Sequence, residues 1–197
     1  MRNLLFASAL AAACLFALPS AHADNTSGFF LNANVGQSNF DKRGYDDSDT
    51  GVGINGGYRW ALAPNFLLGA EVGYADLGSF SPRAGYAGLG KARLKGWNIG
   101  ANAHLNVTDN WYLSGRAGWF RGTLSGGYSL PLNTTPPTTF VENFYGESSN
   151  KWYAGAGFGY DFSNNFSVGL NYDYYKAEKS ALDLNPSLVS VSGEYRF

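Results

Sequence analysis

Apolar and polar residues alternate with a period of two in eight separate segments of the chain. Successive residues of a β-strand point to opposite faces, so this period indicates strands with one apolar face and one polar or small face. The segments lie at 29–36, 51–60, 66–75, 96–107, 111–119, 152–162, 166–175 and 189–197. Gly, Asn, Ser and charged residues dominate the second face, which predicts a polar interior behind an apolar outer surface.

The connections between these segments alternate between short and long. Short connections at 63–65, 108–110 and 163–165 carry Pro, Asn and Asp, which are turn residues. The long polar connections are expected at 37–50, 76–92, 122–151 and 176–187. All short turns then fall at one end, as in an outer-membrane barrel with periplasmic turns and long outer loops.

Aromatic residues separate a membrane barrel from a soluble sandwich, which also alternates. A sandwich would bury its aromatic residues in mid-core. Here they gather at both ends of the apolar faces, with Trp60 and Trp111 near the short turns and Trp97 and Trp119 near the long connections. Two aromatic belts indicate two membrane interfaces.

The eight segments predict an all-β fold, an eight-stranded antiparallel transmembrane up-and-down β-barrel over residues 24–197. An open sheet edge would leave backbone groups unpaired in hydrocarbon, so the last strand must pair with the first. The many inward glycines suit a lumen with room only for side chains.

Residues 1–23 are predicted to form a signal peptide. A basic start is followed by an apolar run from Leu4 to Leu18, and small residues precede a cleavage site after Ala23. A retained anchor would need about 20 apolar residues. A lipoprotein signal at Cys14 is disfavoured because apolar residues follow it. We therefore expect export to the bacterial outer membrane.

Composition narrows the candidate chemistry. The sequence of 197 residues has one Cys, Cys14, and two His, and removal of the leader leaves only His104. Disulfides, thiolate metal sites and centres with two histidine ligands are excluded from the mature chain, so no cofactor is expected. A net charge of −1 argues against a nucleic-acid partner.

Several stretches carry a resemblance to the OmpA-like transmembrane domain family, whose motifs the OmpX and Ail group largely shares. They are Gly57-Tyr58-Arg59, residues 71–78, residues 96–118 and the ending 192–197. The resemblance implies a barrel over the whole mature chain. Tyr195 and the terminal Phe197 resemble the family's assembly signal, which implies the barrel-assembly machinery and periplasmic chaperones as partners during biogenesis. No peptidoglycan-binding domain follows in this sequence, so we expect no tether to the cell wall.

Seven charged residues fall on the inward face of the predicted strands. They are Arg59, Glu71, Arg116, Asp161, Asp173, Glu194 and Arg196. A buried charge is tolerable only when paired, so a lumen network of salt bridges is predicted. Counted from the short turns, Glu71 and Arg116 lie at the same height, which predicts a direct ion pair between them. The network could gate small ions or form a solid core, and the solid core is favoured.

Outward-facing cations lie just beyond the outer aromatic belt. Arg93 and Lys95, preceded by Lys91, lead up to Trp97, and Arg121 follows Trp119. At this height they would meet lipopolysaccharide phosphates, although snorkelling without a specific partner is the alternative. The expected partners are therefore outer-membrane lipids and lipopolysaccharide, and the protein is expected to be a monomer.

The favoured function is a structural, non-enzymatic barrel that supports the envelope and presents surface loops, with adhesion or host interaction as a property of the loops. The first alternative is a lipopolysaccharide-modifying enzyme, for which His104 is the only residue able to exchange protons near neutral pH. No Ser lies two residues after His104, and its inward position favours a space-filling role. The second alternative is a small diffusion channel.

Overall fold

The computed structural model of the chain describes residues 26–42, 45–80, 92–131, 140–179 and 182–197. The expected signal peptide and Lys91 lie outside the described residues. The barrel strands are β1 (Gly28–Lys42), β2 (Tyr45–Ala63), β3 (Phe66–Phe80), β4 (Ala92–Asn106), β5 (Trp111–Pro131), β6 (Phe140–Asp161), β7 (Phe166–Tyr175) and β10 (Ser187–Arg196). Two short strands, β8 (Ala177–Lys179) and β9 (Leu182–Leu184), form a separate hairpin.

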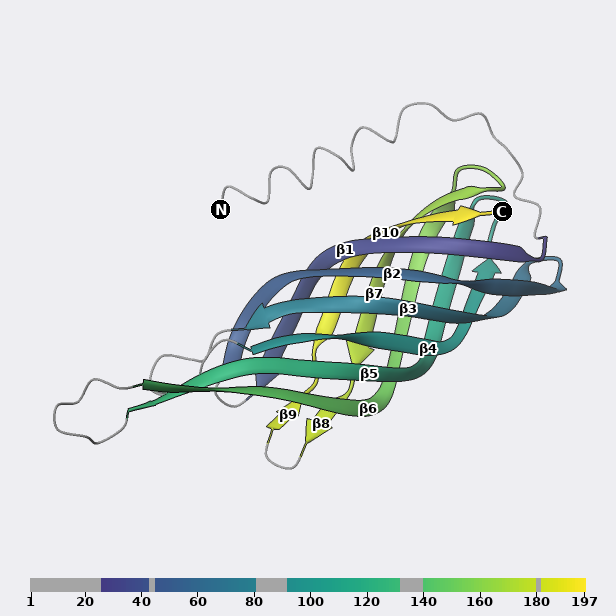
Figure 1. The fold of residues 1–197 in the computed structure, drawn as a ribbon. Coiled ribbons are helices and arrows are strands. Elements are labelled where there is room, and N and C mark those ends of the chain that lie inside the picture. Colours follow the sequence, from purple (N-terminus) through teal and green to yellow (C-terminus); the bar gives the residue numbers. More distant parts are fainter. Residues whose placement is uncertain (1–25, 43–44, 81–91, 132–139, 180–181) are drawn as a thin grey trace, which may run out of the picture.

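These strands form a closed antiparallel barrel in which each strand pairs with its neighbour in sequence (Figure 1). The barrel closes between β1 and β10, where Asn32 lies opposite Glu194 and Val35 opposite Val191. The eight-stranded up-and-down barrel predicted from the sequence is confirmed. Within the described residues, no helix is long and apolar enough to cross a membrane.

The three short turns lie together at the end of the barrel that carries the C-terminus (Figure 1). The Val107 amide donates to the Trp111 carbonyl at 2.8 Å, and the Phe162 amide donates to the Phe166 carbonyl at 2.9 Å. Side chains complete the turns, since the Thr108 hydroxyl accepts from the Trp111 amide at 3.0 Å. These bonds explain why short polar segments suffice to reverse the chain here.

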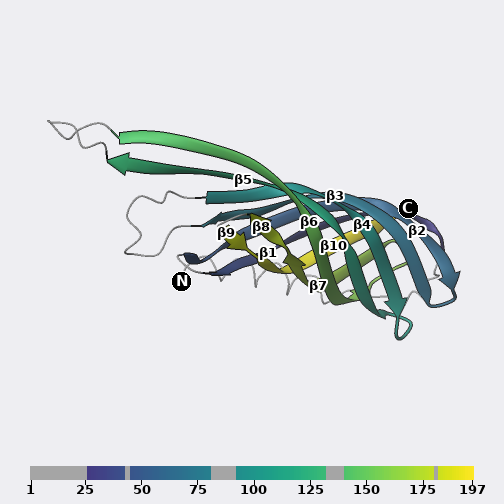
Figure 2. The same cartoon turned by 90° about the horizontal axis from the view of Figure 1, so that it is seen from below.

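The predicted extent of the long outer loops is wrong for 37–50 and 122–151, because strands occupy most of these two segments. Strands β1 and β2 stay paired out to Lys42 opposite Tyr45, and β5 and β6 out to Pro131 opposite Phe140. Beyond the membrane, water solvates both faces of a paired ribbon, so strand pairing continues without the apolar alternation that marks the membrane-spanning part. The β5–β6 ribbon projects past the other strands (Figures 1 and 2).

Burial follows the predicted alternation along the barrel wall. In β10, buried positions such as Ser190, Ser192 and Glu194 alternate with exposed Val189, Val191 and Tyr195. Large apolar side chains on the outer face are strongly exposed, with Trp119 at 69% and Phe29 at 63%. Such an exposed apolar wall is stable in lipid and unsuited to water.

A β-bulge near the outer end of β3 changes the side-chain alternation. Pairing passes from Asp76 opposite Lys95 to Ser79 opposite Arg93, and Gly78 adopts a φ of +83°. Glycine has no Cβ to oppose this left-handed conformation. As a result, Leu77 and Phe80 are both fully buried inside the barrel.

Candidate functional site

The lumen holds buried ion pairs that cross from strand to strand. Arg59 on β2 donates from Nη1 to Glu194 Oε1 at 2.5 Å and from Nη2 to Oε2 at 2.9 Å. Arg59 Nε also donates to Asn102 Oδ1 at 2.6 Å. The Arg59 guanidinium further lies 3.9 Å above the centre of the Phe30 ring. Each of the three guanidinium nitrogens thereby donates a hydrogen bond, which helps to compensate the burial of the charge.

A second bidentate pair joins β5 to β7. Arg116 Nε donates to Asp173 Oδ1 at 2.6 Å, and Arg116 Nη2 donates to Asp173 Oδ2. Arg116 and Asp173 both lie opposite Gly155 of the intervening strand β6. A side chain at position 155 would collide with the Asp173 carboxylate, so the glycine makes room for the pair.

The expected direct ion pair between Glu71 and Arg116 is wrong. Glu71 instead accepts from Asn102 Nδ2 at 2.8 Å and from the Tyr153 hydroxyl at 2.7 Å. Glu71 lies opposite Gly100 on β4, whereas Arg116 lies opposite Asn102, so the two charges occupy rows that are two residues apart. Counting residues from the short turns places the two charges at the same height only if all strands start level. The strands of a tilted barrel are staggered instead.

The remaining lumen charges gather near the short turns. Asp161 Oδ1 accepts from Arg196 Nη2 at 2.5 Å and from the Ser167 hydroxyl at 2.5 Å. His104 Nε2 lies 3.3 Å from the other carboxylate oxygen of Asp161. Arg196 Nε also lies 3.9 Å from Glu194 Oε1, which links this group to the Arg59 pair. All seven charged residues expected in the lumen therefore point inward and are engaged there.

The arrangement around His104 does not form a serine relay. The His104 side chain is almost fully buried and stacks on Tyr112 with ring centres 4.1 Å apart. The Ser167 hydroxyl bonds to the same carboxylate as His104, whereas an activated serine would bond to the imidazole itself. Within the described residues, no group of three His, Cys, Asp or Glu side chains could hold a metal ion.

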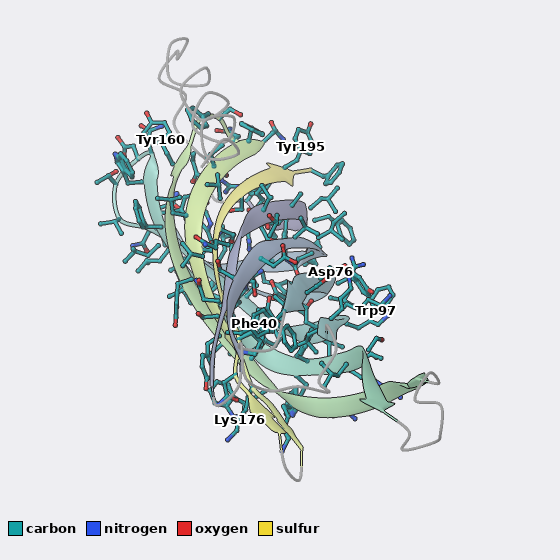
Figure 3. The ribbon with its side chains drawn as sticks, turned by 90° about the vertical axis from the view of Figure 1, so that its left-hand side faces the viewer. Phe40, Asp76, Trp97, Tyr160, Lys176 and Tyr195 are labelled. Atoms are coloured by element: carbon teal, nitrogen blue, oxygen red, sulfur yellow. The ribbon has the colours of Figure 1, made fainter. Side chains whose placement is uncertain are left out.

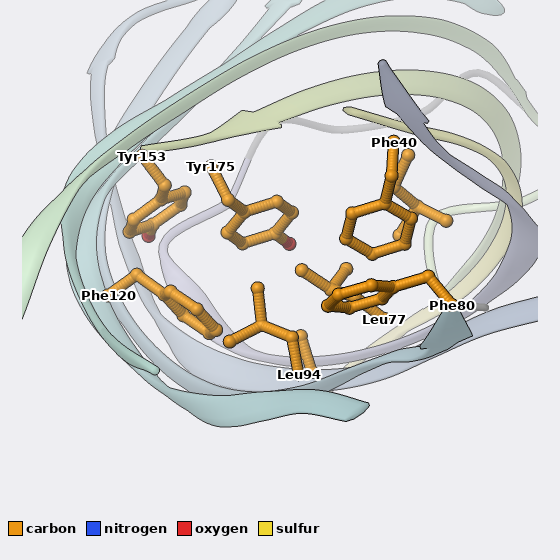
Figure 4. Packing of buried hydrophobic residues seen from close by; sticks show 9 residues of the cluster. Phe40, Leu77, Phe80, Leu94, Phe120, Tyr153 and Tyr175 are labelled. Carbon is orange, nitrogen blue, oxygen red and sulfur yellow. The ribbon is translucent and has the colours of Figure 1, made fainter. Parts of the chain in front are cut away.

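An apolar cluster fills the lumen on the side of the long hairpins, and Figure 4 shows its side chains packed against one another inside the barrel. Its buried members are Phe40, Ala75, Leu77, Phe80, Leu94, Phe120, Tyr153, Tyr175 and Leu188. The rings of Phe120 and Tyr175 meet edge to face with centres 4.9 Å apart. Sequence reasoning missed this cluster because Phe40, Phe80 and Phe120 lie outside the segments that alternate most clearly. Continuing the inward alternation of the fifth segment by one step would have found Phe120.

Little free space remains between the ion pairs of the lumen. The cavity between the ion pairs has a volume of about 20 Å³ and is bordered by Arg59, Glu71, Asn102, Arg116 and Asp173. That is enough for about one water molecule. The described lumen is thus a packed core in which polar and apolar layers follow each other.

Arg93, Lys95 and Arg121, the outward-facing cations, are exposed near the outer aromatic residues, and their contact with lipopolysaccharide stays a prediction. Arg121 lies opposite Trp97, and Lys95 lies two pairs further out, opposite Thr123. Figure 3 shows Asp76 and Trp97 on the outer side of the wall. The alternation along the chain did not predict that Asp76 engages Arg93, yet Asp76 Oδ1 accepts from Arg93 Nε at 3.2 Å. Burial raises the pKa of Asp76, but the bonds from Arg93 and the Gly78 amide outweigh it and hold the pKa below its ordinary value.

The two residues of the expected assembly signal lie at the closing seam. Tyr195 and Phe197 point outward, with exposed fractions of 48% and 72%, and their rings meet with centres 5.0 Å apart. The Phe197 amide donates to the Phe29 carbonyl at 3.0 Å. Their role in assembly stays a prediction.

Comparison with known proteins identifies the fold class. The chain is similar to the crystal structure of Ail, the attachment invasion locus protein of Yersinia pestis, at 17% identity and a TM-score of 0.57, over 87% of this chain and 97% of Ail. It is similar to Neisserial surface protein A at 13% identity and a TM-score of 0.62, over 88% of this chain and 100% of that one. For OprG from Pseudomonas aeruginosa the identity is 14% and the TM-score 0.52, over 90% and 98% of the two chains. At these identities the likeness shows the shared fold.

No curated protein sequence matches the chain. A family profile does match, over residues 8–197, and its description is "Outer membrane protein beta-barrel domain". The lipid-suited outer wall and the closed barrel agree with this match, and the protein is located in the outer membrane. The chain belongs to the outer membrane protein beta-barrel domain family.

Proposed function

We propose that this protein is a structural, non-enzymatic barrel that supports the outer membrane and presents its long hairpins at the cell surface. The packed lumen beneath the projecting β5–β6 ribbon is the observation that carries this proposal. A lumen filled with ion pairs and aromatic rings is suited to rigidity. It offers no wide path for solutes.

The β5–β6 ribbon supports the role in surface presentation. Pairing of β5 with β4 reaches Gly126 and pairing of β6 with β7 begins at Tyr153, yet β5 and β6 pair with each other out to Pro131 and Phe140. The stretch from Phe140 to Tyr153 spans about 40 Å at the usual rise of a strand. A ribbon of this length reaches well beyond the membrane surface and is available to partners outside the cell.

The enzyme alternative requires a reactive group that a lipid can reach. The described lumen places His104 out of contact with lipid, with its ring stacked on Tyr112 and its Nε2 beside Asp161. The channel alternative requires continuous water, whereas the cavity between the ion pairs holds about one molecule.

Three measurements on one set of strains and proteins test the proposal. Cells lacking the protein should become more sensitive to detergent. A variant whose β5–β6 ribbon is shortened by replacing residues 128–143 with Asn-Gly should restore detergent resistance, but it should no longer bind partners outside the cell. Mass spectrometry of lipid A should show the same acyl pattern with and without the protein. A changed pattern that His104→Ala abolishes would establish the enzyme alternative, and discrete conductance in planar bilayers would establish the channel.

A further inference from the structure

The lipid-facing wall carries a groove across β2, β3, β4 and β5. Its lower part is a hollow of about 550 Å³ between Trp60 and Trp119. Its upper part is a hollow of about 380 Å³ that reaches Trp97 and Arg121. The two parts share Ile99 and Trp119 as lining residues, so they form one continuous depression that runs toward the outer rim.

Small side chains on adjacent strands form the floor of this groove. Ala70 lies opposite Ala101, and Ala101 lies opposite Ala117, so three alanines stand side by side on the outer face. On the other side of the barrel, one outward row carries larger residues, with Val35 opposite Val191 and Val191 opposite Leu170, although Ala33 and Gly193 in an adjacent row are small. The three adjacent alanines leave the floor of the groove low between Trp60 and Trp119.

The upper end of the groove is positively charged. Arg121 lines it directly, and Lys95 lies on the neighbouring strand two pairs further out. Both side chains are exposed. Among the described residues, no carboxylate forms a salt bridge with Arg121. Lys95 lies opposite Asp76, whose carboxylate is bound to Arg93. An apolar groove that ends at exposed cations is complementary to an amphiphile with an anionic head.

We propose that this groove binds one acyl chain of lipopolysaccharide, with a lipid A phosphate held by Arg121 and Lys95. The apolar part lies within the hydrocarbon layer and the cations lie at its outer boundary, which matches the order of chain and phosphate in an outer-leaflet lipid. This inference goes beyond the proposed surface role and does not depend on it.

A second copy of the chain is the competing occupant, and the charges disfavour it. A two-fold symmetric dimer would bring the same patch of both copies together. Arg121 and Lys95 would then approach their own counterparts, and like charges at a shared boundary repel. A phosphorylated lipid meets the same cations with the opposite charge.

Lipid retention in nanodiscs tests the proposal. The protein is folded into phosphatidylcholine nanodiscs and titrated with purified lipid A or, in a parallel series, with phosphatidylglycerol. Native mass spectrometry measures the fraction of barrels that retain one lipid. The variant A101L/A117L fills the groove, and A33L adds the same bulk to the outer face of β1 as a matched control. R121Q removes the charge at the head of the groove, and R121K keeps it.

We expect wild-type protein to retain lipid A at least tenfold better than phosphatidylglycerol. A101L/A117L should lower retention of lipid A about tenfold, since it removes the space for several methylene groups. R121Q should lower retention about fivefold, as expected for one cation near an anionic headgroup. A33L and R121K should match the wild type. Heat-shifted migration on gels checks that each variant is folded. The single variants A101L and A117L should retain lipid A at levels between those of the wild type and the double variant.

Three results would overturn the proposal. The first is equal retention of lipid A by wild type and folded A101L/A117L. The second is equal retention of lipid A and phosphatidylglycerol by the wild type, which would show an unselective lipid annulus. The third is a wild-type dimer that A101L/A117L dissociates, which would assign the groove to a second copy. None of these results bears on conductance or lipid A acylation, so the proposed function is tested separately.

Discussion

Double-mutant cycles on the lumen ion pairs give the sharpest test of the packing inside the barrel. The first cycle combines Arg116→Ala and Asp173→Ala. The Arg116 side chain is 11% exposed and that of Asp173 is 1% exposed, so removing either leaves the other charge buried without its partner. Each single substitution should lower the free energy of unfolding by about 3–5 kcal/mol.

The coupling between the two substitutions should be large because the pair shares two charge-assisted hydrogen bonds. We expect the double variant to lose less than the sum of the singles by about 2–3 kcal/mol, near the upper end for contacting residues. A second cycle combines Arg116→Ala with Glu71→Ala, which share no hydrogen bond. Its coupling should stay below about 1 kcal/mol.

Urea unfolding in lipid vesicles, followed by tryptophan fluorescence and by gel migration, measures all six proteins. The two cycles share Arg116→Ala, so a change in the unfolded state caused by that substitution affects both equally. Coupling between Glu71 and Arg116 that equals or exceeds the coupling between Arg116 and Asp173 would refute the arrangement described for the lumen.

Further predictions concern the aromatic cluster, the bulge and the outer rim. Phe120→Ala removes a fully buried ring and should cost about 3–5 kcal/mol in unfolding free energy; planar bilayers should still show no conductance, because the ion pairs below remain. Gly78→Ala should cost about 1–2 kcal/mol in the same unfolding assay, because its φ is +83°; Gly115→Ala should be close to neutral, since a Cβ there meets open space. Asp76 has a lowered pKa, so its ion pair with Arg93 stabilises the fold above the unfolded-state pKa of about 3.9 and is lost as pH falls through the folded-state value. Unfolding midpoints at pH 7 and pH 3 should therefore differ more for wild type than for Asp76→Asn, and equal differences would contradict this role.

The strands and their closure could be predicted because lipid and lumen impose opposite demands on neighbouring residues. Val191 and Ser192 face different surroundings, and this contrast is visible in the sequence alone. The ends of β5 and β6 could not be placed in this way, since water surrounds both faces of a ribbon outside the membrane.

The ion-pair partners depended on information that the alternation does not contain. Glu71 and Arg116 each lie five residues after the start of their strand, yet the stagger of the barrel puts Arg116 in one row with Asn102 and Gly155. The partner of Arg116 is Asp173, reached across a glycine. The inward direction of a charge follows from the sequence, whereas its partner follows from the register of several strands at once.

The seam between β1 and β10 has a consequence for the order of folding. Every other pairing joins consecutive barrel strands, with only the β8–β9 hairpin lying between β7 and β10, so an open sheet with two unpaired edges can form before the ends meet. Asn32 Nδ2 bonds to Glu194 across this seam at 3.4 Å, and Arg59 on β2 reaches the same carboxylate from the first hairpin. Until β10 arrives, Arg59 therefore lacks its counter-ion. The step that pairs the last backbone groups is also the step that neutralises this charge, so backbone pairing and charge pairing favour completion of the barrel together.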